Sequence, residues 1–305
     1  MTRLELDDPF GRGQWRPLER FLIVQGCGKR RVIDNGRKTG HNEHTLMSET
    51  ISTTSVDLIA SAARMTSQAL FGTEPLPAEC PGWLQLRIGT DDLPDAYRGL
   101  PVCEDHLRFS MVAVHVSGLG WRFTILWGLA CGLESAVVAF NRFPQLGVAI
   151  MRRCLLGFAA AYFDDELSVE FITHIDVTKC GLQLAFSLMG ASPQPSKSFP
   201  PACNRHYPGT SVHTGDAFSA GFACFQPKSP TMWKVQRRLR EARFCKSLDR
   251  DTAVKLRGDI NWLWSMCAGF VGKLAGPLLT EKQTSSDPSL TPLQVWNLQL
   301  LEEII

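Results

Sequence analysis

Two acidic segments, DLPDAYRGLPV at residues 92–102 and AYFDD at residues 161–165, decide how this 305-residue chain is interpreted. The first follows Trp83-Leu-Gln-Leu-Arg-Ile88, whose alternating apolar side chains predict a β-strand. The second lies between two apolar runs, so its acids are expected at the tip of a hairpin. Carboxylates at the ends of neighbouring strands of one sheet can converge on a single spot.

Asp92, Asp164 and Asp165 would repel one another at such a spot unless divalent cations bound between them. Mg²⁺ suits this role because it prefers hard oxygen ligands and shares its coordination shell with phosphates. Two Mg²⁺ ions about 4 Å apart, with Mn²⁺ as a substitute, can activate an attacking oxygen and stabilise a leaving one in phosphoryl transfer. The alternative is that each Asp-Asp pair belongs to an ordinary solvated turn.

The two segments resemble the metal-binding motifs of reverse transcriptases, D-x-x-D-A-Y-x-x-x-P followed by Y-x-D-D, in the family's order and separation. Between them, LACGLESA at residues 129–136 looks like the family's L-P-x-G segment, which lies beside the templating base pair. KRRVIDNGR at residues 29–37 resembles the fingers hairpin that holds the incoming triphosphate. PSKS at residues 195–198 resembles the lysine-bearing turn that follows the palm helix.

Further downstream, LRGDINW at residues 256–262 and GFVGK at residues 269–273 look like the thumb or connection helices of one group of reverse transcriptases. That group is the DIRS-like retroelement enzymes of the tyrosine-recombinase kind. The sequence also departs from the family pattern. Ala130 and Cys131 replace the usual proline and its successor in L-P-x-G, and Asn35 stands where an aspartate is common.

The resemblance implies an α+β chain with a right-hand polymerase fold. This fold has an antiparallel palm sheet backed by helices, a fingers hairpin and a helical thumb. The fingers are expected at residues 1–83 and the palm at residues 84–225, with a fingers-side insertion near 104–128. Residues 226–282 are expected to form thumb- or connection-like helices, and residues 283–305 a C-terminal tail.

Apolar spacing at helical period predicts helices at residues 45–70, 134–143, 180–189, 232–245 and 253–274. Pro144 is expected to end the second of these, and another helix is predicted from Arg152 through Tyr162. A hairpin is predicted around the glycine turn at residues 26–28, a connection over residues 74–82, and a loop over residues 193–208.

The resemblance also assigns roles to individual residues. Asp92, Asp164 and Asp165 match the metal-binding acids, with the first two as the principal ligands. Lys29 and Arg31 match the positions that contact the triphosphate, where a planar guanidinium suits phosphate oxygens. The alternative for both cations is a solvated basic hairpin.

Tyr97 matches the aromatic residue under the sugar, which would exclude a ribose 2′-hydroxyl; ordinary core packing is the alternative. The backbone amides of Asp95 and Ala96 would face the phosphates. Gly132 matches the glycine that lets the backbone approach the nucleotide, and it also suits a plain turn. Lys197 could protonate the leaving pyrophosphate, or it could be a solvated loop lysine.

The function implied is that of an RNA-directed DNA polymerase, a nucleotidyltransferase that adds dNTPs to a primer 3′ end on an RNA or DNA template. One alternative is a catalytically inactive or fragmentary domain of the same fold that only binds nucleic acid. This alternative stands because no ribonuclease H or recombinase segment follows the matched region, which ends near residue 275. Another is an unrelated globular protein in which the acids are turn residues.

The net charge of +2 conceals a division along the chain. Residues 11–44 carry eight basic and three acidic residues, and residues 228–282 carry twelve and five. The segments with the motif acids are the reverse, with two basic and seven acidic residues over 74–106 and one and five over 159–180. A polymerase needs cations along the nucleic-acid path and carboxylates at the metal site, so a near-neutral total does not exclude a nucleic-acid partner.

The N-terminal segment at residues 1–17 is charged and has no apolar core, so it does not predict a secretory signal. The most apolar stretch, at residues 123–140, contains Glu134 and falls short of a membrane span. The ten cysteines include no C-x-x-C pair and suggest free thiols in a reducing compartment. These features predict an intracellular protein of the cytoplasm or nucleus with no membrane partner.

Overall fold

The computed structural model describes residues 1–24, 28–51, 53–54, 56–72, 81–207, 209–218, 223–263 and 276–304. These residues form two compact units, which are described one at a time. Unit 1 comprises Met1–Thr53, Asp91–Glu166 and Lys179–Phe199, and unit 2 comprises Thr54–Thr90, Leu167–Thr178 and Pro200–Ile305. The division predicted at residues 83, 225 and 282 follows the reverse-transcriptase architecture and stays a prediction.

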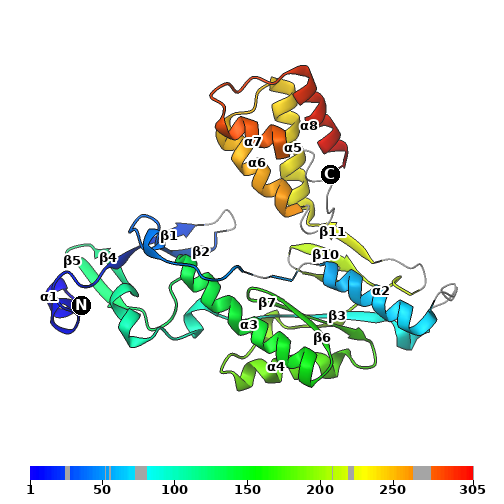
Figure 1. The fold of residues 1–305 in the computed structure, drawn as a ribbon, viewed down its shortest axis with the longest axis horizontal. Helices are drawn as coiled ribbons and strands as arrows, with labels where there is room; N and C mark the ends of the chain where they lie inside the picture. Colours follow the sequence, from blue (N-terminus) through cyan, green and yellow to red (C-terminus); the bar gives the residue numbers. More distant parts are fainter. Residues whose placement is uncertain are drawn as a thin grey trace. The chain divides into compact units, whose positions relative to one another are not determined.

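Unit 1 contains a four-stranded sheet in the order β2-β1-β4-β5 (Figure 1). Its strands are β1 (Pro17–Val24), β2 (Arg30–Asn35), β4 (Met111–Val116) and β5 (Gly120–Ile125). The predicted hairpin of β1 and β2 is present, with antiparallel pairing from Glu19 opposite Asn35 to Val24 opposite Arg30. β4 pairs in parallel with β1, so the two later strands extend the hairpin into a sheet. Of the glycine turn predicted at residues 26–28, residues 26 and 27 lie outside the described residues.

A second sheet has the order β6-β7-β3-β8 and carries the two acidic segments. Its strands are β3 (Leu86–Asp92), β6 (Phe158–Tyr162), β7 (Asp165–Phe171) and β8 (Phe199–Ala202). β3 ends at Asp92, and β6 and β7 form a hairpin with the two-residue turn Phe163-Asp164. The strand and the hairpin tip expected for the acids are therefore both present.

The helix predicted from Arg152 through Tyr162 is wrong in its second half. Ala159, Ala160 and Ala161 have high helix propensity, but they form the centre of β6, where all three are fully buried. Ala159 and Ala161 form part of a core with Phe140 and Phe186 from the neighbouring helices. Tertiary packing thus overrides the local preference of the alanines.

The two helices that complete this core are α3 (Glu134–Cys154) and α4 (Ile175–Leu188). The prediction that Pro144 ends a helix is wrong, because Pro144 lies inside α3. Proline removes one backbone hydrogen bond, and burial of Phe140, Val148 and Met151 from the same helix offsets that loss. The helix predicted at residues 180–189 is the later part of α4.

Unit 2 contains α2 (Asp57–Phe71) and a three-stranded sheet of β9 (Asn204–His206), β10 (Thr210–His213) and β11 (Cys224–Pro227). The helix predicted from residue 45 is wrong at its start, because the described residues between positions 45 and 54 form no helix and α2 begins at Asp57. The loop predicted at residues 193–208 is also partly wrong, since it contains β8 and β9. Of the connection predicted over residues 74–82, residues 74–80 lie outside the described residues.

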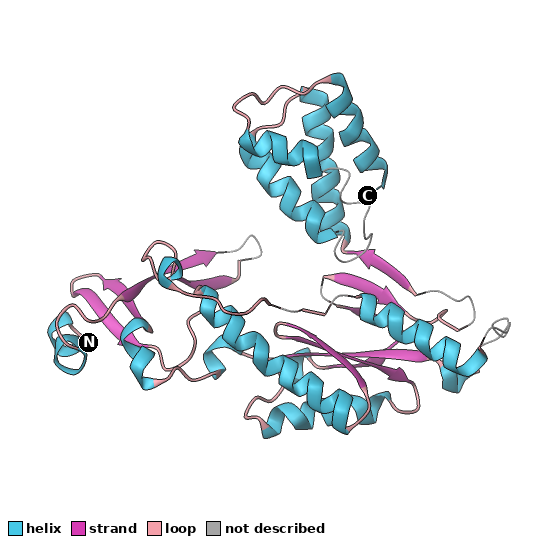
Figure 2. Ribbon diagram, in the orientation of Figure 1, coloured by secondary structure: helices cyan, strands magenta, loops and turns pink. Residues whose placement is uncertain are grey.

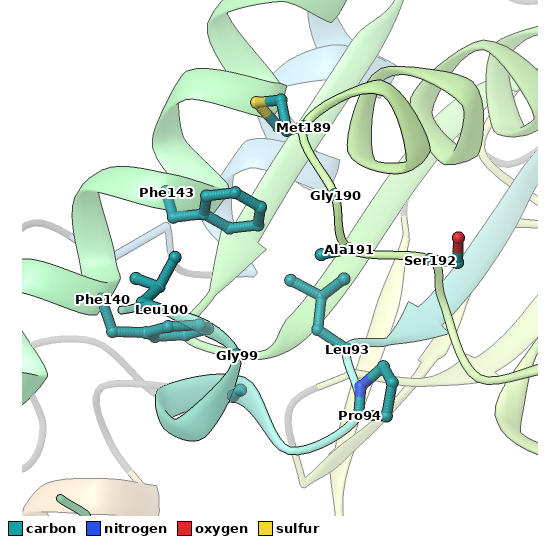
Figure 3. Close-up of a pocket in the computed structure, with 11 residues that line it drawn as sticks. Leu93, Pro94, Gly99, Leu100, Phe140, Phe143, Met189, Gly190, Ala191 and Ser192 are labelled. Carbon is teal, nitrogen blue, oxygen red and sulfur yellow. The ribbon is translucent and has the colours of Figure 1, made fainter. Parts of the chain in front are cut away.

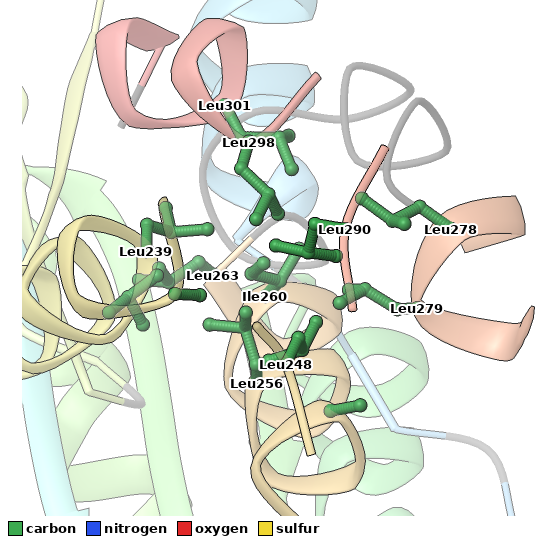
Figure 4. Packing of buried hydrophobic residues seen from close by; sticks show 13 residues of the cluster. Leu239, Leu248, Leu256, Ile260, Leu263, Leu278, Leu279, Leu290, Leu298 and Leu301 are labelled. Atoms are coloured by element: carbon green, nitrogen blue, oxygen red, sulfur yellow. The ribbon is translucent and has the colours of Figure 1, made fainter. Parts of the chain in front are cut away.

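The C-terminal helices of unit 2 pack together, as Figure 2 shows. They are α5 (Ser229–Cys245), α6 (Arg250–Leu263), α7 (Gly276–Thr284) and α8 (Pro292–Ile304). Leucines from all four helices meet in one buried cluster, which Figure 4 shows from close by. The apolar end of the predicted tail is thus a helix, whose Leu298 and Leu301 belong to this core. The later part of the helix predicted at 253–274 lies outside the described residues.

The remaining elements are short. The chain begins with α1 (Arg3–Phe10), which is capped by Thr2. Further 3-10 helices lie at Gly82–Leu84, Ala96–Gly99 (η3), Glu104–Phe109 and Pro195–Lys197 (η5). Within the described residues, no helix combines the length and the apolar character that crossing a membrane requires. The cysteines that the structure describes are all free.

Candidate functional site

The ends of the two acidic segments meet in unit 1. The backbone N–H of Leu93 donates a hydrogen bond to the carbonyl oxygen of Asp164 at 3.0 Å, which joins the end of β3 to the β6–β7 turn. Phe163, the other turn residue, has a φ of 54° in the left-handed region. The structure therefore brings Asp92 and Asp164 together, although they are far apart in sequence.

Burial raises the pKa of the Asp164 carboxyl above its usual range, and the charge of Asp92 adds to this effect. Two cations, Lys197 and Arg31, act in the opposite direction on the same carboxyl. The site is thus a pair of neighbouring acids whose negative charge is partly offset by two cations. A bound cation would reduce the repulsion between the two carboxylates.

Lys197 makes the strongest contact in the site. Its Nζ donates to Oδ2 of Asp92 at 2.6 Å, and the lysine side chain is half exposed. The position of η5 is set by the backbone, because the N–H of Gln194 donates to the carbonyl of Asp92 at 3.0 Å. The N–H of Lys197 in turn donates to the carbonyl of Gln194 at 2.9 Å. The predicted lysine turn is therefore held against the end of β3.

The two cations of the β1–β2 hairpin differ in their relation to the acids. Arg31, in β2, is exposed and acts on the charge of Asp164. Lys29 precedes β2 and is also exposed, with no contact to either acid recorded in the described part of the chain. Arg31 is thus close enough to Asp164 to lower the pKa of its carboxyl, and the triphosphate contacts of Arg31 and Lys29 both stay predictions.

Tyr97 lies on η3, directly after the first acidic strand. Its ring packs on Phe140, with the centroids 4.9 Å apart, and Ala96 lies against the same core. Burial raises the pKa of Tyr97, and the nearby charges of Cys131 and Asp164 add to this. The ring of Tyr97 is therefore packed against the core on the side of Phe140. It also lies near Asp164, and its predicted contact with the sugar stays a prediction.

Asp95 begins the η3 turn with a left-handed backbone, at φ 49°. Its carbonyl oxygen accepts from the N–H groups of Arg98 at 2.7 Å and Gly99 at 3.2 Å. These hydrogen bonds lie within the turn and fix its backbone. The predicted contacts of the Asp95 and Ala96 amides with phosphates stay predictions.

Gly132 lies where two segments of unit 1 touch. Its φ is +132°, and a Cβ at this position would come within 1.8 Å of the carbonyl oxygen of Asp34. The N–H of Asp34 also donates to the carbonyl of Cys131 at 3.4 Å. The glycine is thus required by the close approach of β2, and no nucleotide is needed to explain it.

The metal prediction rests on the chemistry of the donor atoms. Asp92 and Asp164 are the hard oxygen donors that Mg²⁺ uses together with substrate phosphates. Asp165 is the first residue of β7. Among the described residues, however, no three His, Cys, Asp or Glu side chains are arranged to hold a metal ion. Two carboxylates suit an ion that completes its shell with a triphosphate, and the two-ion site stays a prediction.

Sequence reasoning missed the role of Asp91, which the structure separates from Asp92. Asp91 is buried and pairs with Lys179 Nζ at 3.2 Å, while Gln183 Nε2 donates to the same carboxylate oxygen at 3.0 Å. Lys179 also donates to the carbonyl of Phe199 at 2.5 Å. Asp91 therefore anchors α4 and β8 beneath the site and is not available to a ligand.

Glu166 was also missed. It is 1% exposed, and neither carboxyl oxygen has a hydrogen-bond partner among the described residues. Burial raises its pKa to about 9, and the charges of Asp91 and Asp92 add to the shift. Glu166 is therefore a neutral acid at pH 7, so it adds no further negative charge beside the two site acids.

A buried ion cluster joins the hairpin to η3. Asp34 is 1% exposed and accepts from Arg20 Nε at 2.6 Å and Nη2 at 3.2 Å. Arg98, the residue after Tyr97, lies 3.6 Å from the same carboxylate. Asp34 thus ties the strand that carries Arg31 to the turn that follows Asp92.

The fold is similar to that of reverse transcriptases. Solved structures of reverse transcriptases match nearly the whole chain in fold, at low sequence identity. The sequence matches no protein-family model and no curated protein. The fold, and not sequence similarity, therefore carries the relationship.

Two structures of the foamy viral protease-reverse transcriptase are similar to this chain. The complex with double-stranded DNA aligns with a TM-score of 0.59 at 13% identity, covering 94% of this chain. The complex with an RNA/DNA hybrid aligns with a TM-score of 0.60 at 15% identity, covering 98%. This chain spans 43% and 35% of the lengths of those two chains. The comparison supports a reverse-transcriptase-like fold and leaves the DIRS-like affiliation untested.

Proposed function

We propose that this protein is an RNA-directed DNA polymerase that adds dNTPs to a primer 3′ end. The observation that carries this proposal is the proximity of Asp92 and Asp164, with Lys197 bound to Asp92, in a reverse-transcriptase-like fold. Phosphoryl transfer depends mainly on positioning and on charge stabilisation, and this site offers both. The similar solved structures contain double-stranded DNA or an RNA/DNA hybrid, which supports nucleic acid as the partner.

Each side chain has a place in this proposal. Mg²⁺, held by Asp92 and Asp164 with Asp165 beside them, would supply the charge that activates the primer oxygen and stabilises pyrophosphate. Arg31 and Lys29 bind the triphosphate. Tyr97 restricts the space beside the sugar.

Lys197 has two partners in turn. It pairs with Asp92 in the free protein, and when the triphosphate binds it moves to the phosphates and donates a proton to the leaving group. Because Lys197 already lies beside Asp92, its side chain would move only a short distance to reach the phosphates.

The proposal also covers the finer architecture. We assign residues 1–83 to the fingers, 84–225 to the palm and 226–282 to the thumb, following the family resemblance. The DIRS-like affiliation belongs to the same proposal and rests on residues 256–262, which lie in α6, and on residues 269–273, which lie outside the described residues.

The test is primer extension on an RNA template with Mg²⁺. We expect extension by the unaltered protein and loss of at least about 10³-fold of the rate in Asp164→Asn, since the carboxylate is removed without changing its shape. Asp105→Asn, on an exposed 3-10 helix of the same unit, is the matched control and should retain the rate. Folded protein that binds primer–template and never extends it would contradict the proposal.

A second candidate is a non-catalytic domain that binds nucleic acid. It is favoured by one observation: the side chain of Lys197 already pairs with Asp92, one of the two acids expected to hold the metal. Such a domain would show binding that weakens with salt in proportion to the phosphates contacted, with no incorporation. Mg²⁺-dependent incorporation decides between the two candidates.

A further inference from the structure

A cavity of about 520 Å³ lies in unit 1, and none of the acids of the candidate site lines it. Its wall comes from three parts of the chain: the segments that flank the β1–β2 hairpin, the 3-10 helix Glu104–Phe109 with its neighbours, and residues 129–135. A volume of this size is typical of sites that bind small organic molecules. Leu46 and Ser135 are exposed lining residues, so a molecule can enter from solvent.

One side of the cavity is apolar and rigidly held. Val102, Leu129, Ala130 and Leu133 line it. Ala130 is fully buried in a small core with residues of β1 and β4, and Leu133 packs against the same core. The exposed ring of Phe109 adds an aromatic surface. An apolar body placed on this side would lose its contact with water at a gain in free energy.

Arg16 supplies positive charge to the cavity. Its guanidinium lies over Gly40, because a Cβ at Gly40 would come within 3.0 Å of Nη2 of Arg16. In the part of the chain that the structure describes, the Arg16 side chain has no ion pair or hydrogen bond, and no acidic side chain lines the cavity. A guanidinium carries five N–H donors, so Arg16 can bind an anion without giving up a protein partner.

Three histidines also line the cavity, and they differ in what they offer. Both ring nitrogens of His41 already have partners, with Nδ1 2.8 Å from Oγ1 of Thr39 and Nε2 3.2 Å from the carbonyl oxygen of Arg16. His41 therefore positions the backbone of Arg16. His44 and His106 are exposed, and their rings have no hydrogen-bond partner among the described residues. Either imidazole can donate to an anionic oxygen.

The combination of an apolar wall and unpaired donors defines the ligand class. An uncharged apolar molecule would leave the donors of Arg16 unused, and a bare inorganic anion would leave the apolar wall exposed to water. Another cavity of unit 1, of about 160 Å³, provides a contrast, because Leu93, Phe140 and Phe143 line it and no charged side chain does (Figure 3). Positive charge is thus a distinguishing feature of the larger cavity.

We propose that the larger cavity binds a small organic anion that has an aromatic body and a phosphate or carboxylate at one end. The anionic group accepts hydrogen bonds from Arg16 and from His44 or His106. The aromatic body lies on the apolar wall and contacts Leu129 and Leu133. This binding is independent of the proposed polymerase function, since no residue of the candidate site takes part in it.

The test is isothermal titration calorimetry of the whole protein with 1-naphthyl phosphate. We expect saturable binding, and at least tenfold weaker binding of inorganic phosphate and of 1-naphthol, each of which lacks one half of the ligand. Arg16→Gln should weaken binding of 1-naphthyl phosphate at least tenfold. Arg12→Gln is the matched control, because it removes the same charge from an exposed arginine that does not line the cavity, and it should bind as the unaltered protein does. 1-Naphthoate is titrated in parallel, and the tighter of the two ligands identifies the anionic group.

Binding that requires both the ring and Arg16 supports the site. Equal affinities of the Arg16→Gln and Arg12→Gln variants, or no binding of either naphthyl ligand at millimolar concentration, overturns it. If thermal melting shows that Arg16→Gln does not fold, Ser135→Phe, which places a ring in the mouth of the cavity, replaces it with the same expectation. A short single-stranded DNA that displaces 1-naphthyl phosphate and itself binds more weakly to Arg16→Gln would mean that the cavity holds a nucleic-acid strand, which overturns a small-molecule ligand.

Discussion

The Nζ atom of Lys197 lies 2.6 Å from Oδ2 of Asp92, although the two residues are 105 positions apart. The contact joins the end of β3 to η5, and backbone bonds through Gln194 hold the two segments in place. Both side chains retain solvent contact, at 49% and 17% exposure, so the pair can open when a competing anion arrives. This is the property required of a cation that must leave a carboxylate for a phosphate.

Lys197→Gln should lower the single-turnover rate of primer extension about 10²-fold at saturating dNTP, because the proposed proton donor for the leaving group is removed. The free energy of unfolding should change by no more than about 1 kcal/mol, since the pair is partly exposed. Rapid-quench kinetics measure the rate. Lys255→Gln, an exposed lysine of α6, should keep the rate, and equal rates for the two variants would contradict a role for Lys197.

Asp34→Ala should destabilise the protein by about 3 kcal/mol, because it leaves the largely buried guanidinium of Arg20 without its partner. Glu19→Ala, in the same hairpin, removes only an exposed pair with Lys38 and should cost at most about 1 kcal/mol. Urea unfolding followed by circular dichroism compares the two. A small and equal loss for both would mean that the Asp34 cluster does not hold the hairpin to η3.

Gly132→Ala should disturb the contact between β2 and the segment before α3. The new methyl group would overlap the carbonyl of Asp34, and overpacking of this kind costs about 1–3 kcal/mol beyond the backbone strain. Gly118→Ala is the control, because it also has a positive φ but nothing within 4 Å, so it carries only strain of about 1–2 kcal/mol. The difference between the thermal unfolding midpoints of the two variants measures the cost of the steric overlap alone. Equal midpoints would contradict the close approach of Gly132 to the carbonyl of Asp34.

The elements that the sequence predicted well depend on local patterns. The β1–β2 hairpin and the turn at Asp164 follow from alternating apolar residues and turn chemistry, which act over a few positions. The missed features depend on distant partners. Asp91 bonds to Gln183, 92 positions away, and nothing near Asp91 distinguishes it from Asp92.

Burial separates these two aspartates, and burial is a property of the folded sheet. Adjacent residues of a strand point to opposite faces, so Asp91 points into the core and Asp92 toward the site. The same alternation hides Glu166 behind Asp165. The errors at Pro144 and at the β6 alanines have a similar origin, because packing in unit 1 outweighs the local preference of each residue.

His41 should make stability depend on pH. Burial lowers its pKa below the ordinary 6.5, so the unfolded chain takes up a proton more readily than the folded protein. Stability is therefore complete above about pH 6.5 and declines as the pH falls toward the pKa of the folded protein. We expect the difference in unfolding free energy between the unaltered protein and His41→Gln to shrink from pH 8 to pH 5. A difference that stays constant over this pH range would contradict the prediction.

Leu298→Ala should cost about 2–5 kcal/mol, because the side chain is fully buried among the leucines of α5 to α8 (Figure 4). Leu293→Ala, in the same helix, removes a side chain that is 67% exposed and should change stability by roughly 0.5 kcal/mol or less. Urea unfolding measured by circular dichroism gives both values. If the two variants lost the same small amount, α8 would be an accessory tail; a large difference means that the last helix completes the core of this bundle.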